Sequence, residues 1–231
     1  MKFNFKKHGL RSFIGLAASV AVIVLVVVGV TSCNRISLFQ LALDNISESR
    51  FYLKQDQTDN IRVQFSSGMR EEVYVRDGIS GRTTAFGLVS VEPLTNVFGD
   101  AIELQATLRI NGENLAITLE RNQFGRNFGH DIERLVCVSA QVSLALTVGT
   151  QTIVFNLTNT MTDNCINWER ALEIAVDHLA GKIRNAGRFE VYVRIIADLV
   201  RGSGSYWFIQ FVPEKSAPFF AVISSSGEII R

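Results

Sequence analysis

Two segments that alternate apolar and polar residues around a tight turn restrict the fold of this chain more than any other feature. In residues 101–120, AIELQATLRINGENLAITLE, the central Asn111-Gly112 pair is typical of a two-residue hairpin turn, because both residue types tolerate a positive φ. A slip of one residue would turn every apolar side chain to the other face, so the register is well specified. The predicted pairs are Leu104–Leu119, Ala106–Ile117 and Leu108–Leu115.

A second hairpin is predicted in residues 138–158, VSAQVSLALTVGTQTIVFNLT, with Gly149-Thr150 at its turn. Its predicted pairs are Val142–Leu157, Leu144–Phe155 and Leu146–Ile153. Further short apolar runs, bounded by polar or glycine-containing turns, begin at residue 49. About seven or eight antiparallel strands in residues 49–160 indicate a sandwich or a small barrel, and we expect a β-sandwich-like domain.

Residues 161–231 predict one helix followed by strands. Asn167 is a suitable N-cap for a helix that Gly187 would end, and the apolar residues between them recur at helical spacing. Strand-like segments follow in residues 188–200, 205–213 and 217–230. A helix on an antiparallel sheet is an α+β layer, so the expected fold class is mainly β with an α+β C-terminal part.

Three segments of this C-terminal part, ALEIAVDHLAG, YWFIQFV and FFAVISSSGEII, resemble the pattern of PepSY domains. The region from residue 166 to 231 is also similar to cystatin-like folds, in which a sheet wraps around one helix. The turn Ser225-Ser226-Gly227-Glu228 departs from the Asp- and Thr-bearing turn of the PepSY pattern. The resemblance implies a PepSY/cystatin-like fold, an exported bacterial protein and, as a hypothesis, restraint of a peptidase.

The first 33 residues predict export. Four basic residues precede an uncharged run of 18 apolar or small residues, Phe13 to Val30. A membrane helix needs about 18 such residues, whereas the apolar core of a signal peptide has about 7–15. The basic residues place the N-terminus in the cytoplasm, so residues 34–231 are expected on the extracytoplasmic face of the cell membrane. Residues 34–48 would form a tether or a short helix.

The sequence VTSC at the end of this run resembles a bacterial lipobox, which implies cleavage before Cys33 and lipidation of its sulfur. An uncleaved anchor is an equal alternative, and a cleaved, freely secreted form is a minor third. The membrane would thus hold the chain through residues 13–30 or through lipidated Cys33. Cys137 and Cys165 would then remain as a pair for a disulfide in an oxidising compartment, with two free thiols as the alternative.

Charge and motifs exclude several functions. Outside residues 1–33 the chain carries 19 basic and 22 acidic residues, whereas a nucleic-acid-binding protein needs a basic face. No HExxH or GxSxG motif and no His/Cys pair at metal spacing occurs, so we predict no metal, no cofactor and no catalytic residues. A Ser/His/Asp triad built from distant residues stays open, because triads are defined by geometry and not by spacing.

Two places are candidates for binding. The segment from residue 121 to 134, RNQFGRNFGHDIER, is the longest irregular loop and contains Arg126 and His130. The favoured alternative is a solvated connection whose phenylalanines pack on the sheet. The second place is the aromatic pair Tyr206 and Trp207, of which one must point away from the helix because strand residues alternate faces. Packing of this pair in the core is again the favoured alternative.

These observations predict a membrane-tethered, extracytoplasmic binding or regulatory protein without enzymatic activity. Its partner would be another envelope protein, including a peptidase that it restrains. The alternative is an accessory or sensor lipoprotein that binds a small ligand or a wall glycan, and an uncharacterised extracytoplasmic hydrolase comes third.

Overall fold

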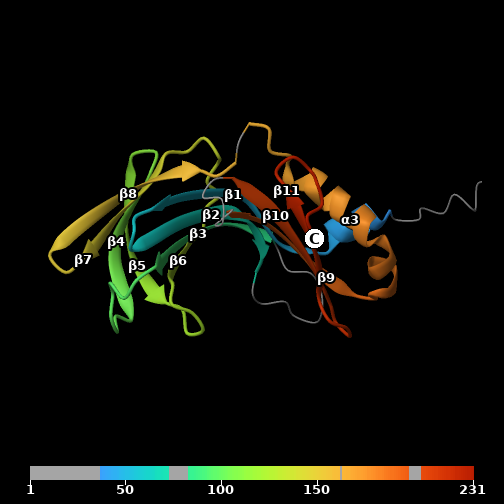
Figure 1. The fold of residues 1–231 in the computed structure, drawn as a ribbon, viewed down its shortest axis with the longest axis horizontal. Coiled ribbons are helices and arrows are strands. Elements are labelled where there is room, and N and C mark those ends of the chain that lie inside the picture. The colour runs from blue at the N-terminus through green and yellow to red at the C-terminus, as the bar shows by residue number, and fades with distance from the viewer. Residues whose placement is uncertain (1–36, 73–82, 162, 198–203) are drawn as a thin grey trace, which may run out of the picture. The chain divides into compact units, whose positions relative to one another are not determined.

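One continuous sheet organises the part of the chain that the computed structural model describes, which comprises residues 37–72, 83–161, 163–197 and 204–231. Its strand order is β11-β10-β9-β1-β2-β3-β6-β5-β4-β7-β8, and β1 also pairs with β8 (Figure 1). The strands are β1 (Ile46–Gln57), β2 (Ile61–Glu71), β3 (Thr83–Pro93), β4 (Glu103–Ile110), β5 (Glu113–Arg121), β6 (Phe128–Ile132), β7 (Val142–Val148), β8 (Gln151–Asn159), β9 (Phe189–Ala197), β10 (Ser205–Pro213) and β11 (Phe219–Ser224). The helices are α2 (Leu38–Asp44) and α3 (Trp168–Asn185).

Strands β1 to β8 form a closed antiparallel barrel. Closure depends on the pairing of β1 with β8, where Lys54 lies opposite Asn159 and Gln55 opposite Thr158. The predicted sandwich is therefore wrong, and the barrel alternative is correct. Alternation in the sequence shows which residues share a face, but it does not show that the last strand of a series pairs with the first.

Both predicted hairpin registers are confirmed. All three predicted pairs of the first hairpin occur between β4 and β5, and all three of the second occur between β7 and β8. At the first turn Asn111 has φ 49° and Gly112 has φ 88°, which is the backbone that this residue pair tolerates. The apolar side chains of these strands fill the barrel core, which includes Leu108, Leu119, Leu144, Leu146 and Phe155.

Helix α3 and strands β9 to β11 form the predicted α+β layer. The side chain of Asn167 accepts a hydrogen bond from the backbone N–H of Arg170, as expected for an N-cap. The backbone turns at Gly187, which has φ 69°. The apolar stripe of α3 packs on one face of the antiparallel strands in a second core, which includes Leu172, Val176, Val193, Trp207 and Ile209.

Strand β1 belongs to both the barrel and the α+β layer (Figure 1). Its first part runs parallel to β9, from Ile46 opposite Val191 to Arg50 opposite Arg194, and its second part lies in the barrel. Residues 38–231 are one compact unit, so the boundary predicted between residues 160 and 161 lies inside that unit. The segment predicted as a tether or short helix contains α2, which packs on α3.

The predicted export segment lies outside the described residues, and so do its membrane run, residues 13–30, and Cys33. In the described part of the chain, no helix is both long and apolar enough to cross a membrane.

Candidate functional site

Helix α3 covers one face of strands β9 to β11, and the candidate site lies on the opposite face. Trp207 points toward the helix, is only 1% exposed, and its Nε1 donates to the carbonyl oxygen of Ile166 at 3.0 Å. Tyr206 is therefore the outward member of the pair, and its side chain is half-buried. The proposal that Trp207 lies on a binding surface is wrong, because its ring is part of the core.

The face opposite α3 is here called the outer face. It is defined by alternate residues of four neighbouring strands, all of them half-buried: Glu48 and Arg50 on β1, Tyr192 and Arg194 on β9, Tyr206 and Phe208 on β10, and Phe220 on β11. The ring centroids of Phe208 and Phe220 are 5.2 Å apart. The guanidinium of Arg231 lies 5.3 Å from the Phe220 centroid, so aromatic rings and a cation adjoin at this edge.

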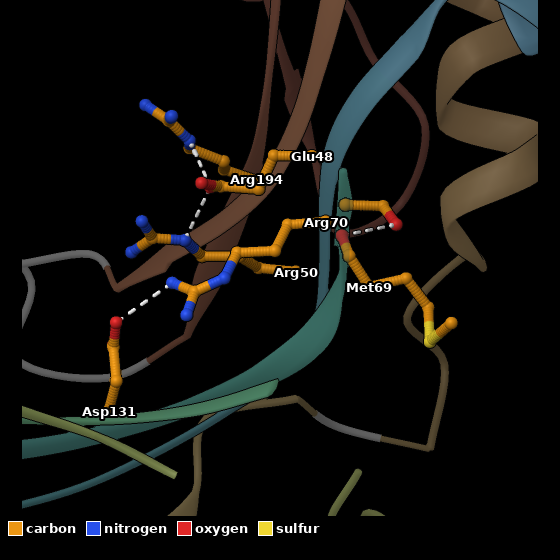
Figure 2. A network of polar contacts seen from close by, with 7 residues as sticks. Glu48, Arg50, Met69, Arg70, Asp131 and Arg194 are labelled. Atoms are coloured by element: carbon orange, nitrogen blue, oxygen red, sulfur yellow. Dashed lines mark hydrogen bonds and ion pairs between the residues drawn. The ribbon is translucent and has the colours of Figure 1, made fainter. Parts of the chain in front are cut away.

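A carboxylate shared by two arginines lies at the β1 side of the outer face. The Oε1 atom of Glu48 accepts hydrogen bonds from Nε of Arg50 and from Nε of Arg194, each at 2.7 Å (Figure 2). The parallel pairing of β1 with β9 brings these groups together. Burial by itself would raise the pKa of Glu48, but the charges and hydrogen bonds of the two arginines outweigh burial and hold the pKa below the ordinary value.

A second ion pair extends this group toward the barrel. Nη1 of Arg70 on β2 donates to Oδ2 of Asp131 on β6 at 2.9 Å (Figure 2). The Arg70 guanidinium lies 4.8 Å from the ring centroid of buried Phe86, and the Arg50 guanidinium lies 6.0 Å from the same centroid. We call Arg50, Arg70, Arg194, Glu48 and Asp131 the arginine cluster.

Gly68 on β2 lies between Arg50 on β1 and Phe86 on β3. It lies opposite Arg50 on one side and opposite Phe86 on the other. The register of β1 shifts just after Arg50, and here the strands come so close that a Cβ atom on Gly68 would lie 1.8 Å from the carbonyl oxygen of Ser49. The missing side chain thus permits the bulge in β1 that positions Arg50.

Tyr192 fixes the other end of the cluster. Its hydroxyl donates to Oε2 of Glu190 at 2.6 Å, and this hydrogen bond, with burial, raises the pKa of Tyr192 to about 12. The guanidinium of Arg194 stacks over the Tyr192 ring at 4.9 Å from its centroid. The carboxylate of Glu190 on β9 is therefore bound to the tyrosine.

The predicted binding loop is divided between two depressions on the barrel. His130 and Asp131 line one of about 570 Å³, and Nδ1 of His130 lies 2.8 Å from the carbonyl oxygen of Thr118. Arg126 lines the other, of about 340 Å³, together with Asp100. The structure thus places Asp131 in the arginine cluster but does not bring Arg126 to it.

The two phenylalanines of this loop behave differently. Phe128 is buried in the barrel core, as the alternative of a solvated connection requires. Phe124 is 98% exposed at the loop tip, so the expectation that both rings pack on the sheet is wrong for this residue. The amide nitrogen of Phe124 donates to the side chain of Asn122, which fixes the turn without covering the ring.

The structure does not join the predicted disulfide partners, and Cys137 and Cys165 are free thiols. Cys137 is exposed, and a hydrogen bond with Ser139 lowers its pKa. Cys165 packs on the core beneath α3, where burial raises its pKa. The two sulfurs therefore lie in different chemical environments.

Within residues 37–72, 83–161, 163–197 and 204–231, no group of three or more His, Cys, Asp or Glu side chains is arranged to hold a metal ion. Comparison of the chain with protein-family models, with curated proteins and with solved structures gives no match.

Sequence reasoning missed most of the arginine cluster. The only signals were the alternation of polar with apolar residues in RFEVYVR, which places Arg194 on one face of its strand, and the two-residue spacing of Glu48 and Arg50, which places both on one face of theirs. Their meeting could not be predicted, because Glu48 and Arg194 are 146 positions apart.

Proposed function

We propose that this chain is a membrane-tethered, extracytoplasmic protein without enzymatic activity, and that it docks another envelope protein on its outer face. Tyrosine, phenylalanine and arginine are enriched at the centres of protein interfaces, whereas lysine and glutamate are depleted there. The outer face presents this composition in Arg50, Arg194, Tyr206, Phe208 and Phe220. This concentration of residue types on one face of the sheet is the observation that carries the proposal.

The strand scaffold also favours docking. The outer face belongs to strands whose other face is fixed on α3 through buried residues such as Val193 and Ile209. Side chains on such a rigid sheet lose little conformational freedom when a partner binds. Restraint of a peptidase is a narrower form of the same proposal. Its support is the PepSY-like pattern of residues 166–231 together with the packing of α3 on the sheet.

A photo-crosslinking amino acid at Phe208, introduced into the protein in its native membrane, tests the docking surface. The matched control carries the same group at Val154, which is 58% exposed on β8 of the barrel. We expect one discrete crosslinked species from position 208 and none from position 154. Equal crosslinking from both positions, or none from position 208, would contradict the proposal.

The tether is tested by the intact mass of the membrane form. A chain that starts at Cys33 and carries diacylglycerol would establish lipid anchoring, and a full-length chain would establish the apolar anchor of residues 13–30. Recovery of a cleaved chain from the soluble fraction alone would contradict membrane tethering.

A second candidate function is the sensing of a small ligand. The observation that favours it is the depression of about 570 Å³ on the barrel, because Glu120, Arg121, His130 and Asp131 converge on it. Loss of ligand binding on His130→Ala, with no loss on Phe208→Ala, would favour this function over docking.

A further inference from the structure

The arginine cluster has an uneven charge balance. Its three arginines face two carboxylates, and one of those, Glu48, uses a single oxygen for both Arg50 and Arg194. Each of these two arginines binds Glu48 through Nε, and in the described part of the chain no hydrogen bond reaches their Nη atoms. The five side chains of the cluster therefore carry a net charge of +1, because Arg50 and Arg194 share one carboxylate.

The cluster is also partly removed from water. The side chain of Arg50 is 26% exposed and that of Arg194 is 31% exposed, whereas Glu48 is 15% exposed. A charge in such a place interacts more strongly with a new partner than a fully solvated charge does, because the effective dielectric constant is lower. Stacking of Arg194 on Tyr192 and the shared Glu48 hold the guanidinium groups in position before any partner arrives.

The overall charge of the chain indicates which kind of anion the arginine cluster can bind. Residues 34–231 contain more acidic than basic residues, so the body repels extended polyanions such as nucleic acids and strongly anionic surfaces. A local surplus of one charge instead suits one or two carboxylates of a protein segment. On the same face, Phe208 and Phe220 form an aromatic surface that an apolar side chain of the segment can cover.

We propose that the arginine cluster and the adjoining outer face bind an acidic segment of the partner protein. A carboxylate of the segment lies between Arg50 and Arg194, on the side opposite Glu48, and an apolar side chain lies against Phe208 and Phe220. This inference rests on the proposed docking function and adds the chemistry of the segment that is recognised.

The test uses the full-length protein in neutral lipid nanodiscs and a fluorescein-labelled, N-acetylated peptide of alternating Glu and Phe. Binding is followed by fluorescence anisotropy. Two control peptides replace Glu with Gln or Phe with Ser. We expect binding of the Glu–Phe peptide to weaken as salt is raised, and to be about tenfold tighter than that of either control, as for a charge-assisted contact beside an aromatic surface. Equal binding of the Gln–Phe peptide would overturn the proposal.

Two variants that should change the affinity for the peptide in opposite directions distinguish a loss of recognition from misfolding. Arg194→Gln should weaken binding of the Glu–Phe peptide by about tenfold, since it removes one of the two guanidinium groups that hold the carboxylate. Asp131→Asn should tighten binding by a few-fold, because it releases Arg70 from its ion pair. Arg62→Gln is the matched control, because it breaks the Arg62–Glu92 pair on the barrel and should leave the affinity unchanged.

Three outcomes would overturn the proposal: equal loss in Arg62→Gln and Arg194→Gln, no gain in Asp131→Asn, or binding of anionic vesicles through Arg194 without binding of the peptide. Photo-crosslinking from Phe208 shows whether docking itself fails or only the recognition of an acidic segment. If the crosslink persists in Arg194→Gln, docking stands and the acidic segment fails; if the wild type gives no crosslink, the docking function itself fails.

Discussion

The barrel and the α+β layer use strands in opposite ways. In the barrel, strands β2 to β8 turn apolar side chains into a closed core, and the best-defined pairs belong to hairpins that are adjacent in the sequence. In the layer, α3 covers one face of β9 to β11, and the other face carries Arg194 and aromatic rings. In the proposed function, the barrel provides stability and the layer, with β1, provides the docking surface.

Truncation of Phe155 should have the largest effect on stability. Its side chain is fully buried in the barrel, so Phe155→Ala should lower the free energy of unfolding by about 3–5 kcal/mol, through lost burial and the cavity left behind. Phe208→Ala on the outer face should cost about 1 kcal/mol, since that ring is only half-buried. Urea denaturation followed by far-UV circular dichroism measures both. Similar losses would contradict the division between the two regions.

Gly68→Ala should be nearly as damaging, because it acts where the two regions join. The added Cβ would meet the carbonyl oxygen of Ser49, and β1 would have to move away from β2. We expect a loss of about 3 kcal/mol in the free energy of unfolding. The matched control is Gly181→Ala in α3, where the new methyl group meets no atom within 4 Å. This control should stabilise the protein by about 0.5–1 kcal/mol. A mild effect at Gly68 would refute the close approach of the strands.

The shared carboxylate should make stability depend on pH. The pKa of Glu48 in the folded protein lies below the ordinary value of 4.5, so the unfolded chain binds more protons in this range. The stabilisation by Glu48 is fully present above pH 4.5 and is lost as the pH falls through the lower, folded pKa. Glu48→Gln should flatten this part of the stability curve. An unchanged acid limb in the variant would show that the arginines do not hold this carboxylate.

Substitution of the cysteines should have the smallest effect on stability. The two thiols should, however, differ clearly in reactivity. Exposed Cys137, whose pKa is lowered, should react quickly with a thiol reagent such as dithionitrobenzoate. Half-buried Cys165, whose pKa is raised, should react slowly. Cys137→Ser should remove the fast phase, and Cys165→Ser should leave it intact. Absence of both reactions in the native protein would instead indicate the disulfide.

The parts of the fold that the sequence predicts are the local ones. Asn111-Gly112 and the alternation around it determine a hairpin register, and Asn167 with Gly187 marks the ends of a helix, since each signal acts within a few residues. Closure of the barrel through Lys54 and Asn159 has no such signal, because it joins strands that are far apart in the chain.

In the candidate site, too, only the local features could be predicted from the sequence. Alternation of faces predicts that one of Tyr206 and Trp207 points outward, and the burial of Trp207 identifies Tyr206. The arginine cluster could not be predicted, because it needs the parallel pairing of β1 with β9 and the bulge after Arg50. Such non-local pairings depend on the whole chain, and no local pattern specifies them.

Hydroxyl-radical footprinting tests whether the outer face is covered by a partner, by comparing oxidation of the outer face and of the barrel in intact cells and in the purified protein. Phe124, 98% exposed at the barrel loop, serves as the internal reference. We predict that Phe208 and Phe220 are protected in cells relative to the purified protein, whereas Phe124 reacts equally in both. Equal oxidation of Phe208 in the two samples, or protection of Phe124 instead, would contradict the assignment of the outer face as the docking surface.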